Sequence, residues 1–299
     1  MHGLQQLAQQ LINGLVIGSV YSLIALGYTM VFGILGFINF AHGDVYMIGS
    51  FIGLMLLGTG AFNFATALVG AAILTGIVGI AIEKVAYRPI RQSGKGFEDT
   101  MLVSAIGVSI FLETLALIIW GTETHPMGAV LHKVSYQVGG IYISSVQLLI
   151  LGLAVGLMVV LHLFVTRTVT GAAMRATAQN MMAARLMGIS VDRIVSVTFA
   201  IGSVLAAIGG LLVGAYFDAV YPLMGWTAGV KAFTAAVVGG VGSIPGAMIA
   251  GVLIGLIETL GSAYISSGFR DGFAFIILIL ALLFFPSGIF QVRRGEGKS

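Results

Sequence analysis

Long apolar runs separated by short polar segments dominate the pattern of this chain. A helix that spans a bilayer needs about 20 consecutive apolar residues. Most runs reach that length, whereas 45–60 and 228–244 are short and interrupted by glycine, so each is expected to cross fully, cross partly or re-enter. The pattern predicts eight or nine membrane segments, at 11–35, 45–60, 62–86, 100–120, 143–166, 194–217, 228–244, 245–266 and 272–291.

The composition excludes a water-soluble domain. The chain has 299 residues, of which 58% are hydrophobic and only 8% are charged, against about 25% charged residues in soluble proteins. In lipid the backbone must satisfy its own hydrogen bonds, which long unbroken apolar runs do as helices. We therefore expect an all-α polytopic membrane protein that forms one membrane domain over residues 1–299. Cysteine is absent, which excludes disulfides and thiolate sites.

The distribution of basic residues predicts the orientation in the membrane, because cytoplasmic loops are enriched in Lys and Arg. Eleven of the 14 basic residues lie in 84–95, 167–193 and the C-terminal tail, which we place in the cytoplasm. The segments 121–142 and 218–227 are poor in basic residues and belong outside, as does the N-terminus. The eleven are Lys84, Arg88, Arg91, Lys95, Arg167, Arg175, Arg185, Arg193, Arg293, Arg294 and Lys298.

Glycine is abundant, with 43 residues. Small residues at helix interfaces allow close packing in lipid, where the hydrophobic drive between helices is weak. The pairs Gly14–Gly18 and Gly251–Gly255 have the spacing of such interfaces, so we expect them to pack helices together.

A polar cluster interrupts the first apolar region at 36–51, "GFINFAHGDVYMIGSF". Asp44 precedes an apolar run and is predicted to cap a helix N-terminus. Asn39 and His42 are expected to satisfy backbone freed by a helix break at Gly36–Gly43. Two interpretations remain open. The segment is either a cytoplasmic turn or irregular backbone that lines a translocation path, where such backbone is tolerated at membrane depth.

A second interruption lies at 237–251, "VVGGVGSIPGAMIAG". Gly- or Pro-interrupted segments in both halves of a chain indicate a transporter site. Lys231 precedes this region and is expected either at the membrane interface or facing a cavity. The candidate substrate pathway consists of Asn39, His42, Asp44, Lys231 and Ser243.

Two carboxylates lie deep within predicted spans. Glu113 and Glu258 are expected to face the bundle interior, because an exposed charge in lipid is costly. They act either as hydrogen-bonded packing groups or as a proton relay. Arg270 and Asp271 stand at a helix start, where an interfacial role is sufficient.

The cytoplasmic segment 167–193 has helical periodicity. A short amphipathic helix there would dock in a groove of another protein or lie on lipid headgroups. Its Ala- and Met-rich sides favour docking. Arg175, Gln179, Met182 and Leu186 recur at helical spacing.

Motifs of catalysis and nucleotide binding are absent from the sequence. There is no G-x-x-x-x-G-K-[ST] phosphate loop, no H-E-x-x-H and no nucleophile elbow. We predict no catalytic residues, no metal site, no nucleic-acid partner and no enzyme activity in this chain.

Residues 13–49, "NGLVIGSVYSLIALGYTMVFGILGFINFAHGDVYMIG", and 171–189, "GAAMRATAQNMMAARLMGI", resemble permease subunits of branched-chain amino acid ABC importers. The resemblance extends over essentially the whole chain, and its opening motif is highly specific. It implies a bacterial inner-membrane subunit surrounded by lipid. The implied partners are a second homologous permease, two cytoplasmic ATPase subunits that bind ATP and Mg, and a periplasmic amino-acid-binding protein.

ABC importer permeases carry a cytoplasmic coupling loop of the form E-A-A-x-x-x-G. Here "MAARLMG" matches it through Ala183, Ala184 and Gly188, with Met182 at the acidic position. Docking needs only an exposed short helix, so we still expect it. Because Met182 carries no charge, we do not expect the ion pair that a glutamate at this position would form. The residues assigned to coupling are Arg175, Gln179, Met182, Ala183, Ala184 and Gly188.

Other functions are compatible with parts of this pattern. The same family includes permeases for urea and short amides. A stand-alone proton-coupled carrier would use Glu113 and Glu258, and a membrane scaffold would transport nothing. Association with ATPase subunits separates the importer from the last two.

Overall fold

The computed structural model describes residues 2–93, 97–128, 131, 134–285 and 288–290. Eight helices in this part of the chain are long and apolar enough to cross a membrane, which agrees with the predicted all-α membrane class. Five basic residues from the orientation argument lie outside the described residues, namely Lys95, Lys133, Arg293, Arg294 and Lys298.

The eight long helices follow the predicted apolar runs. They are α1 (His2–Leu35), α2 (Ala41–Gly58), α3 (Phe64–Ile82, continued to Ser93), α5 (Phe97–Trp120), α6 (Ser145–Arg167), α9 (Val191–Phe217), α11 (Ile244–Tyr264) and α12 (Arg270–Phe284, preceded by the 3₁₀ turn Ser267–Phe269). The shorter elements are the π-helical turn η1 (Glu83–Tyr87), α4 (Arg88–Ser93), α7 (Val169–Gln179), α8 (Met181–Leu186), α10 (Met224–Gly239) and strands β1 (Ser135–Val138) and β2 (Ile141–Ser144).

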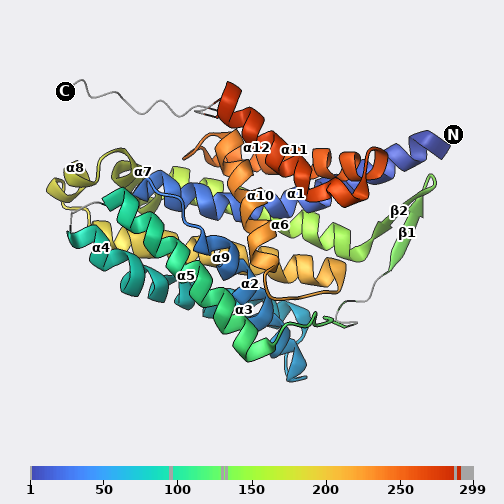
Figure 1. Cartoon of the computed structure of the whole chain (residues 1–299), viewed down its shortest axis with the longest axis horizontal. Helices are drawn as coiled ribbons and strands as arrows, with labels where there is room; N and C mark the ends of the chain where they lie inside the picture. Colours follow the sequence, from blue (N-terminus) through green and yellow to red (C-terminus); the bar gives the residue numbers. More distant parts are fainter. Residues whose placement is uncertain (1, 94–96, 129–130, 132–133, 286–287, 291–299) are drawn as a thin grey trace.

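The two ends of the bundle differ in character (Figure 1). Helices α4, α7 and α8 lie at one end, and the N-terminus and the β1–β2 hairpin lie at the other. Gln9 of α1 exchanges two hydrogen bonds with the backbone of Tyr142, with N···O distances of 2.9 and 2.8 Å. His125 and Val220 form a β-bridge between the two loops predicted to be outside. In the described residues the fold therefore separates 84–93 and 167–193 from the predicted outer loops, as the charge pattern requires.

Helices α1 and α11 pack antiparallel through the glycines identified in the sequence. A Cβ atom on Gly255 would lie 2.3 Å from Cα of Gly18, and one on Gly18 would lie 2.7 Å from the carbonyl oxygen of Val252. Ser22 donates a 2.7 Å hydrogen bond to the carbonyl of Met248 across the same interface. The prediction that these glycines pack helices is confirmed.

The segment 84–95 was predicted as a loop, and this is wrong for its described part. Residues Glu83–Ser93 continue α3 as η1 and α4. The carboxylate of Glu83 is buried and pairs with Arg88 at 2.7 Å and Arg91 at 2.9 Å. These ion pairs offset the cost of burying Glu83, so the polar sequence does not end the helix.

The hairpin in 121–142 was not predicted, although its signal is present in the sequence. Strands β1 and β2 pair antiparallel around Gly139 and Gly140, whose φ values are 59° and 85°. A two-residue turn with both φ values positive suits a hairpin and favours glycine. The last helix, α12, also ends at Phe284, earlier than the predicted boundary of 291.

Helix α10 forms most of the segment predicted at 228–244. Its 16 residues correspond to about 24 Å at 1.5 Å per residue, which is shorter than the hydrocarbon layer of about 30 Å. It crosses α1 steeply (Figure 1) and contacts α1, α2, α11 and α12. The short segment is therefore a mostly buried helix packed among α1, α2, α11 and α12.

Gly255→Leu is expected to lower the free energy of unfolding by about 3 kcal/mol, because the new side chain must force α11 away from the backbone of α1. Gly152→Leu is the matched control, since a Cβ on Gly152 in α6 meets no atom within 4 Å. Thermal unfolding of the purified protein, followed by size-exclusion chromatography, checks this. Equal melting temperatures for the two variants would contradict the packing role.

Candidate functional site: an aromatic pocket beside the helix break

The chain between α1 and α2 returns toward the middle of the membrane before α2 begins. Gly36 has a φ of 76°, and helical structure resumes at Ala41. The ring of His42 lies against Gly27, and its Nε2 is 3.2 Å from the carbonyl oxygen of Ile24. Ile24 and Gly27 lie near the midpoint of the apolar run 11–35. This geometry favours irregular backbone at membrane depth over a simple cytoplasmic turn.

Asn39 and His42 hold this break in place through neighbouring helices. Asn39 is buried, and its Oδ1 accepts a 2.7 Å hydrogen bond from the hydroxyl of Tyr87 in η1. Phe37 packs edge-on against the same ring, with 5.3 Å between centroids. His42 packs edge-on against Tyr28. Both predicted polar residues therefore bond to other helices, not to backbone freed by the break.

The prediction that Asp44 is an N-cap is wrong. Helix α2 begins four residues earlier than predicted, with Phe40 at the cap position and no side-chain cap. The backbone N–H of His42 donates to the carbonyl of Asn39 at 3.1 Å, which starts the helical turn before Asp44. Asp44 instead lies in the first turn and turns toward α5.

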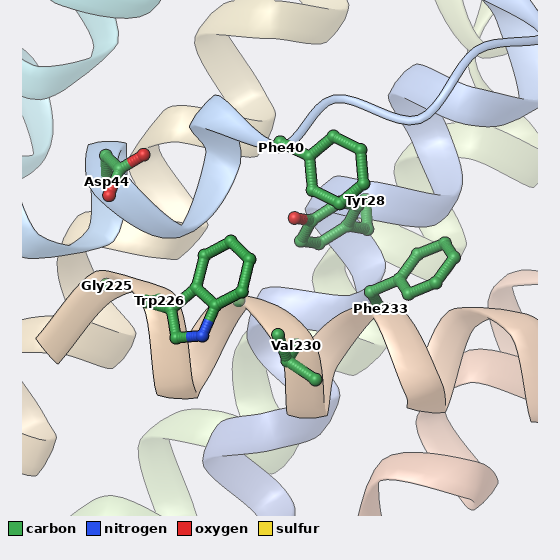
Figure 2. A pocket seen from close by; sticks show the side chains of 8 residues that line it. Tyr28, Phe40, Asp44, Gly225, Trp226, Val230 and Phe233 are labelled. Atoms are coloured by element: carbon green, nitrogen blue, oxygen red, sulfur yellow. The ribbon is translucent and has the colours of Figure 1, made fainter. Parts of the chain in front are cut away.

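A small pocket lies beside this first turn, between α1, α2 and α10 (Figure 2). Figure 2 shows the rings of Tyr28, Phe40 and Phe233 grouped at one side, with Trp226 between them and Asp44. Helix α10 approaches α2 closely, because a Cβ on Gly225 would lie 2.6 Å from the carbonyl oxygen of Gly43. The lining residues are Tyr28, Phe40, Asp44, Gly225, Trp226, Gly229, Val230 and Phe233.

Asp44 is the one carboxylate in the pocket lining, and it is 2% exposed. One carboxylate oxygen accepts a hydrogen bond from the hydroxyl of Ser109. The other, Oδ1, has no hydrogen-bond partner, and Asp44 forms no ion pair with any described residue. The N-terminal dipole of α2 favours a negative charge at this position, but a buried carboxylate without a cation remains costly. The pocket can therefore accept an N–H donor, with aromatic faces suited to a cation or an aliphatic group.

Lys231 and Glu258 meet in a second, separate cluster. Lys231 is 7% exposed, and its Nζ lies 3.0 Å from Oε1 of Glu258 and 2.7 Å from Asp271. The same Oε1 also accepts hydrogen bonds from Tyr21 at 3.2 Å and from Arg270 at 2.5 Å. The ammonium group of Lys231 is therefore buried in an ion-pair cluster and does not extend into solvent. These ion pairs join α10, α11 and α12 through Oε1 of Glu258, while its buried Oε2 has no hydrogen-bond partner among the described residues.

Ser243 caps the start of α11. Its Oγ accepts a 3.1 Å hydrogen bond from the backbone N–H of Gly246. A Cβ on Gly33 would lie 3.2 Å from Cα of Gly242, so the second interruption lies beside the end of α1. The two breaks found in the sequence are neighbours in space. Ser243 has a local role there and does not line the aromatic pocket.

The coupling segment forms two helices instead of one. Asn180 separates α7 from α8 and caps α8 by accepting a 2.9 Å hydrogen bond from the N–H of Ala183. Arg175 donates to the carbonyl of Val165 at the end of α6. Gly188, with a φ of 83°, follows the end of α8.

Helix α8 presents an apolar surface away from the bundle. Ala184 is buried against the rest of the protein, whereas Leu186 is 82% exposed. Met182 and Met187 are also exposed, as are Gln179 and Ala183. Of the residues assigned to coupling, Ala184 holds α8 to the bundle, and the side chains available for docking belong chiefly to α8.

Of the five predicted pathway residues, Asp44 alone lines the aromatic pocket. Sequence reasoning missed the aromatic residues and Ser109, because four helices far apart in the sequence supply them. One signal was available: Gly225 and Gly229 have the small-x-x-x-small spacing of a close helix contact. Within the described residues, no three His, Asp or Glu side chains gather as a metal site would require.

Comparison with known proteins extends over nearly the whole chain. Permease protein LivH of the high-affinity branched-chain amino acid transport system of Escherichia coli K12 is 42% identical over 94% of both chains. BraD of Pseudomonas aeruginosa, described as the corresponding permease protein, is also 42% identical over 94% of both. A probable branched-chain amino acid transport permease of Methanocaldococcus jannaschii is 29% identical over 96% of this chain and 94% of the relative.

A solved structure shares the fold at much lower sequence identity. PsaBC from Streptococcus pneumoniae, in complex with Fab, superposes with a TM-score of 0.52 at 10% identity, covering 93% of this chain and 92% of the other. The family described as the permease component of the branched-chain amino acid transport system matches residues 10–282. With this match and the 42% identity over most of its length, this multi-pass membrane protein belongs to the branched-chain amino acid transport permease family.

Proposed function

We propose that this chain is the inner-membrane permease subunit of an ATP-driven importer of branched-chain amino acids. The observation that carries the proposal is the 42% identity to the LivH and BraD permeases over 94% of the chain. A periplasmic binding protein delivers the substrate to the outer loops, and a second homologous permease completes the path.

The residues around the aromatic pocket suit a substrate of this class, but the cavity of about 20 Å³ has room for about one water, so we expect α1, α2 and α10 to separate before an amino acid enters. A branched-chain amino acid carries an aliphatic side chain and an α-ammonium group. The rings of Tyr28, Phe40 and Phe233 offer apolar contact to the first, and Oδ1 of Asp44 offers an acceptor to the second. One unpaired carboxylate in a small pocket makes a weak, transient site, which suits a path that must release its substrate.

The open side of the pocket suits the second permease. Trp226 lines the pocket and is 54% exposed in this chain. An exposed tryptophan is typical of the centre of a protein interface, where a partner covers it. We therefore place the translocation path between α1, α2 and α10 of this chain and the partner permease.

The energy for transport comes from outside this polypeptide. The sequence has no phosphate loop, so two partner ATPase subunits bind ATP and Mg and drive the cycle. A groove on these ATPase subunits receives α8. Leu186 at the end of α8 and Met187 directly after it are exposed and form a small apolar surface. Coupling requires that the ATPase subunits contact this apolar surface differently in their two nucleotide states.

Vesicles that contain this chain with a second permease and two ATPase subunits are expected to accumulate radiolabelled leucine only when ATP is inside and loaded binding protein is outside. Vesicles with this chain alone should accumulate none. Uptake by the isolated chain under an imposed proton gradient would overturn the proposal in favour of a proton-coupled carrier. Uptake of urea or acetamide without leucine uptake would reassign the substrate class.

Asp44→Asn is expected to reduce leucine uptake at least about tenfold, because a charge-assisted hydrogen bond to the ammonium group contributes about 1.5–3 kcal/mol. The amide keeps the size of the side chain and its contact with Ser109. Uptake in vesicles with matched amounts of assembled complex measures the effect.

Glu113→Gln is the matched control, since Glu113 lies on the same helix as Ser109 but does not line the pocket. Its uptake should stay within twofold of the parent. Unchanged uptake in the Asp44→Asn variant would remove Asp44 from the path. Loss of uptake in the Glu113 variant alone would point to a proton relay.

Leu186→Asp is expected to leave membrane insertion intact and to abolish stimulation of ATPase activity by loaded binding protein, because it places a charge at the centre of the docking surface. Val169→Asp is the control, as Val169 is 88% exposed on α7, away from α8. Binding-protein-stimulated ATP hydrolysis by the reconstituted complex provides the readout. Equal stimulation in both variants would exclude α8 as the coupling element.

A further inference from the structure

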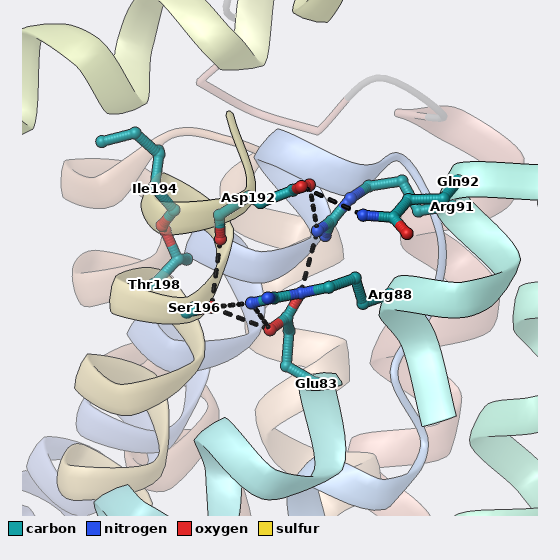
Figure 3. Close-up of polar contacts among 8 residues, drawn as sticks. All are labelled: Glu83, Arg88, Arg91, Gln92, Asp192, Ile194, Ser196 and Thr198. Atoms are coloured by element: carbon teal, nitrogen blue, oxygen red, sulfur yellow. Dashed lines mark hydrogen bonds and ion pairs between the residues drawn. The ribbon is translucent and has the colours of Figure 1, made fainter. Parts of the chain in front are cut away.

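A cluster of charged residues joins the end of α3 to the start of α9 (Figure 3). Glu83 is fully buried, and its two carboxylate oxygens pair with Arg88 and Arg91. Arg91 also pairs with Asp192 of α9 at 2.8 Å. Ser196 donates to Glu83 at 2.8 Å and accepts from Arg88. Figure 3 shows these side chains converging between the two helices.

Positive charge exceeds negative charge around this cluster. Two carboxylates, Glu83 and Asp192, are already engaged by Arg88 and Arg91. The Nε and Nη1 atoms of Arg91 are buried without an acceptor among the described residues. Lys84 and Arg193 are exposed beside the cluster and form no ion pair with any described residue. An anion at this place would therefore meet unsatisfied cations.

A groove between α3 and α9 begins at these cations and continues along apolar side chains. Lys84, Arg88, Arg193 and Ser196 line its polar end, and Ile80, Val197, Ala200 and Ile201 line the remainder. On α3, Ile73 and Ile77 continue the same stripe toward the outer end, and both are 57% exposed. The groove thus has a cationic head and an apolar trough that follows the helix axis.

We propose that this groove is a binding site for an anionic phospholipid of the inner leaflet. The phosphate lies between Lys84 and Arg193, and one acyl chain follows Ile80, Val197 and Ile201 toward the membrane interior. Basic pockets between transmembrane helices on the cytoplasmic side have the chemistry that recognises anionic headgroups. A docked protein would meet the cations equally well, but the trough runs into the apolar depth of the membrane, where a lipid chain fits.

The site also has a consequence for the fold. A bound phosphate would hold Lys84 of η1 and Arg193 of α9 together and so reinforce the junction that Glu83, Arg91 and Asp192 form. Helix α9 follows directly after α8, so this junction positions the coupling helix. The lipid is therefore expected to stabilise the inner end of the permease.

The test uses the purified importer complex in detergent and measures retained lipid by native mass spectrometry. Phosphatidylglycerol is expected to remain bound to the parent complex and to fall at least threefold in the Lys84→Gln/Arg193→Gln variant. Arg167→Gln is the matched control, because Arg167 is an exposed cation at the same end, on α6, outside the groove. The control should retain the lipid of the parent. Equal retention in the double variant and the control would overturn the proposal.

Further measurements separate the sources of the anion. Phosphatidylglycerol should raise the melting temperature of the parent complex but not that of the double variant. Phosphatidylcholine and inorganic phosphate should leave the melting temperature of both complexes unchanged. Stabilisation by inorganic phosphate alone would show a simple anion site and refute the lipid assignment. A photoreactive phosphatidylglycerol should crosslink to peptides containing Ile80 or Ile201. Crosslinks of these peptides to another subunit, with none to lipid, would identify a protein interface instead.

Discussion

Backbone groups inside a bilayer have no water to bind, so an interruption of a helix at that depth must be enclosed by other parts of the protein. The return of the chain at residues 36–40 depends on this constraint. His42 reaches the carbonyl of Ile24, and Asn39 accepts from Tyr87, so α1 and η1 hold the irregular segment on both sides. Helix α10 closes the remaining side through Gly225. The irregular segment in turn places the first turn of α2, and with it Asp44, beside the middle of the apolar run of α1.

Close glycine packing makes this enclosure possible. Gly255 meets the backbone of Gly18, and Gly43 meets that of Gly225, at separations that leave no room for a side chain. Attraction between helices in lipid comes mainly from such contact and from polar bonds between helices. The ion pairs of Lys231 and Glu258 add polar bonds on the far side of α10. The short helix is thereby fixed on both sides, although its length is insufficient to span the membrane alone.

The two buried charge clusters differ from Asp44 in their partners. Glu83 and Glu258 each meet two cations, which offsets the cost of desolvating them. Asp44 has one hydroxyl and no cation among the described residues. Three carboxylates in similar apolar surroundings thus have different physical roles. Two of them join helices, and the third remains available to a ligand.

The sequence by itself determined the membrane class, the long helices and the family resemblance, because apolar length and motifs are local properties of the chain. It also identified both breaks and the Gly14–Gly18 and Gly251–Gly255 interface. Only the tertiary structure decided which side chains share a site. Phe40 and Trp226 are far apart in sequence and become neighbours through the packing of α10 on α2, and Lys231 finds Glu258 across two helices. Contacts between distant residues leave no periodic signal in the sequence. The predicted pathway residues therefore looked alike in the sequence, and only the packing of the helices shows that Ser243 is a cap, Lys231 forms structural ion pairs and Asp44 has no cation.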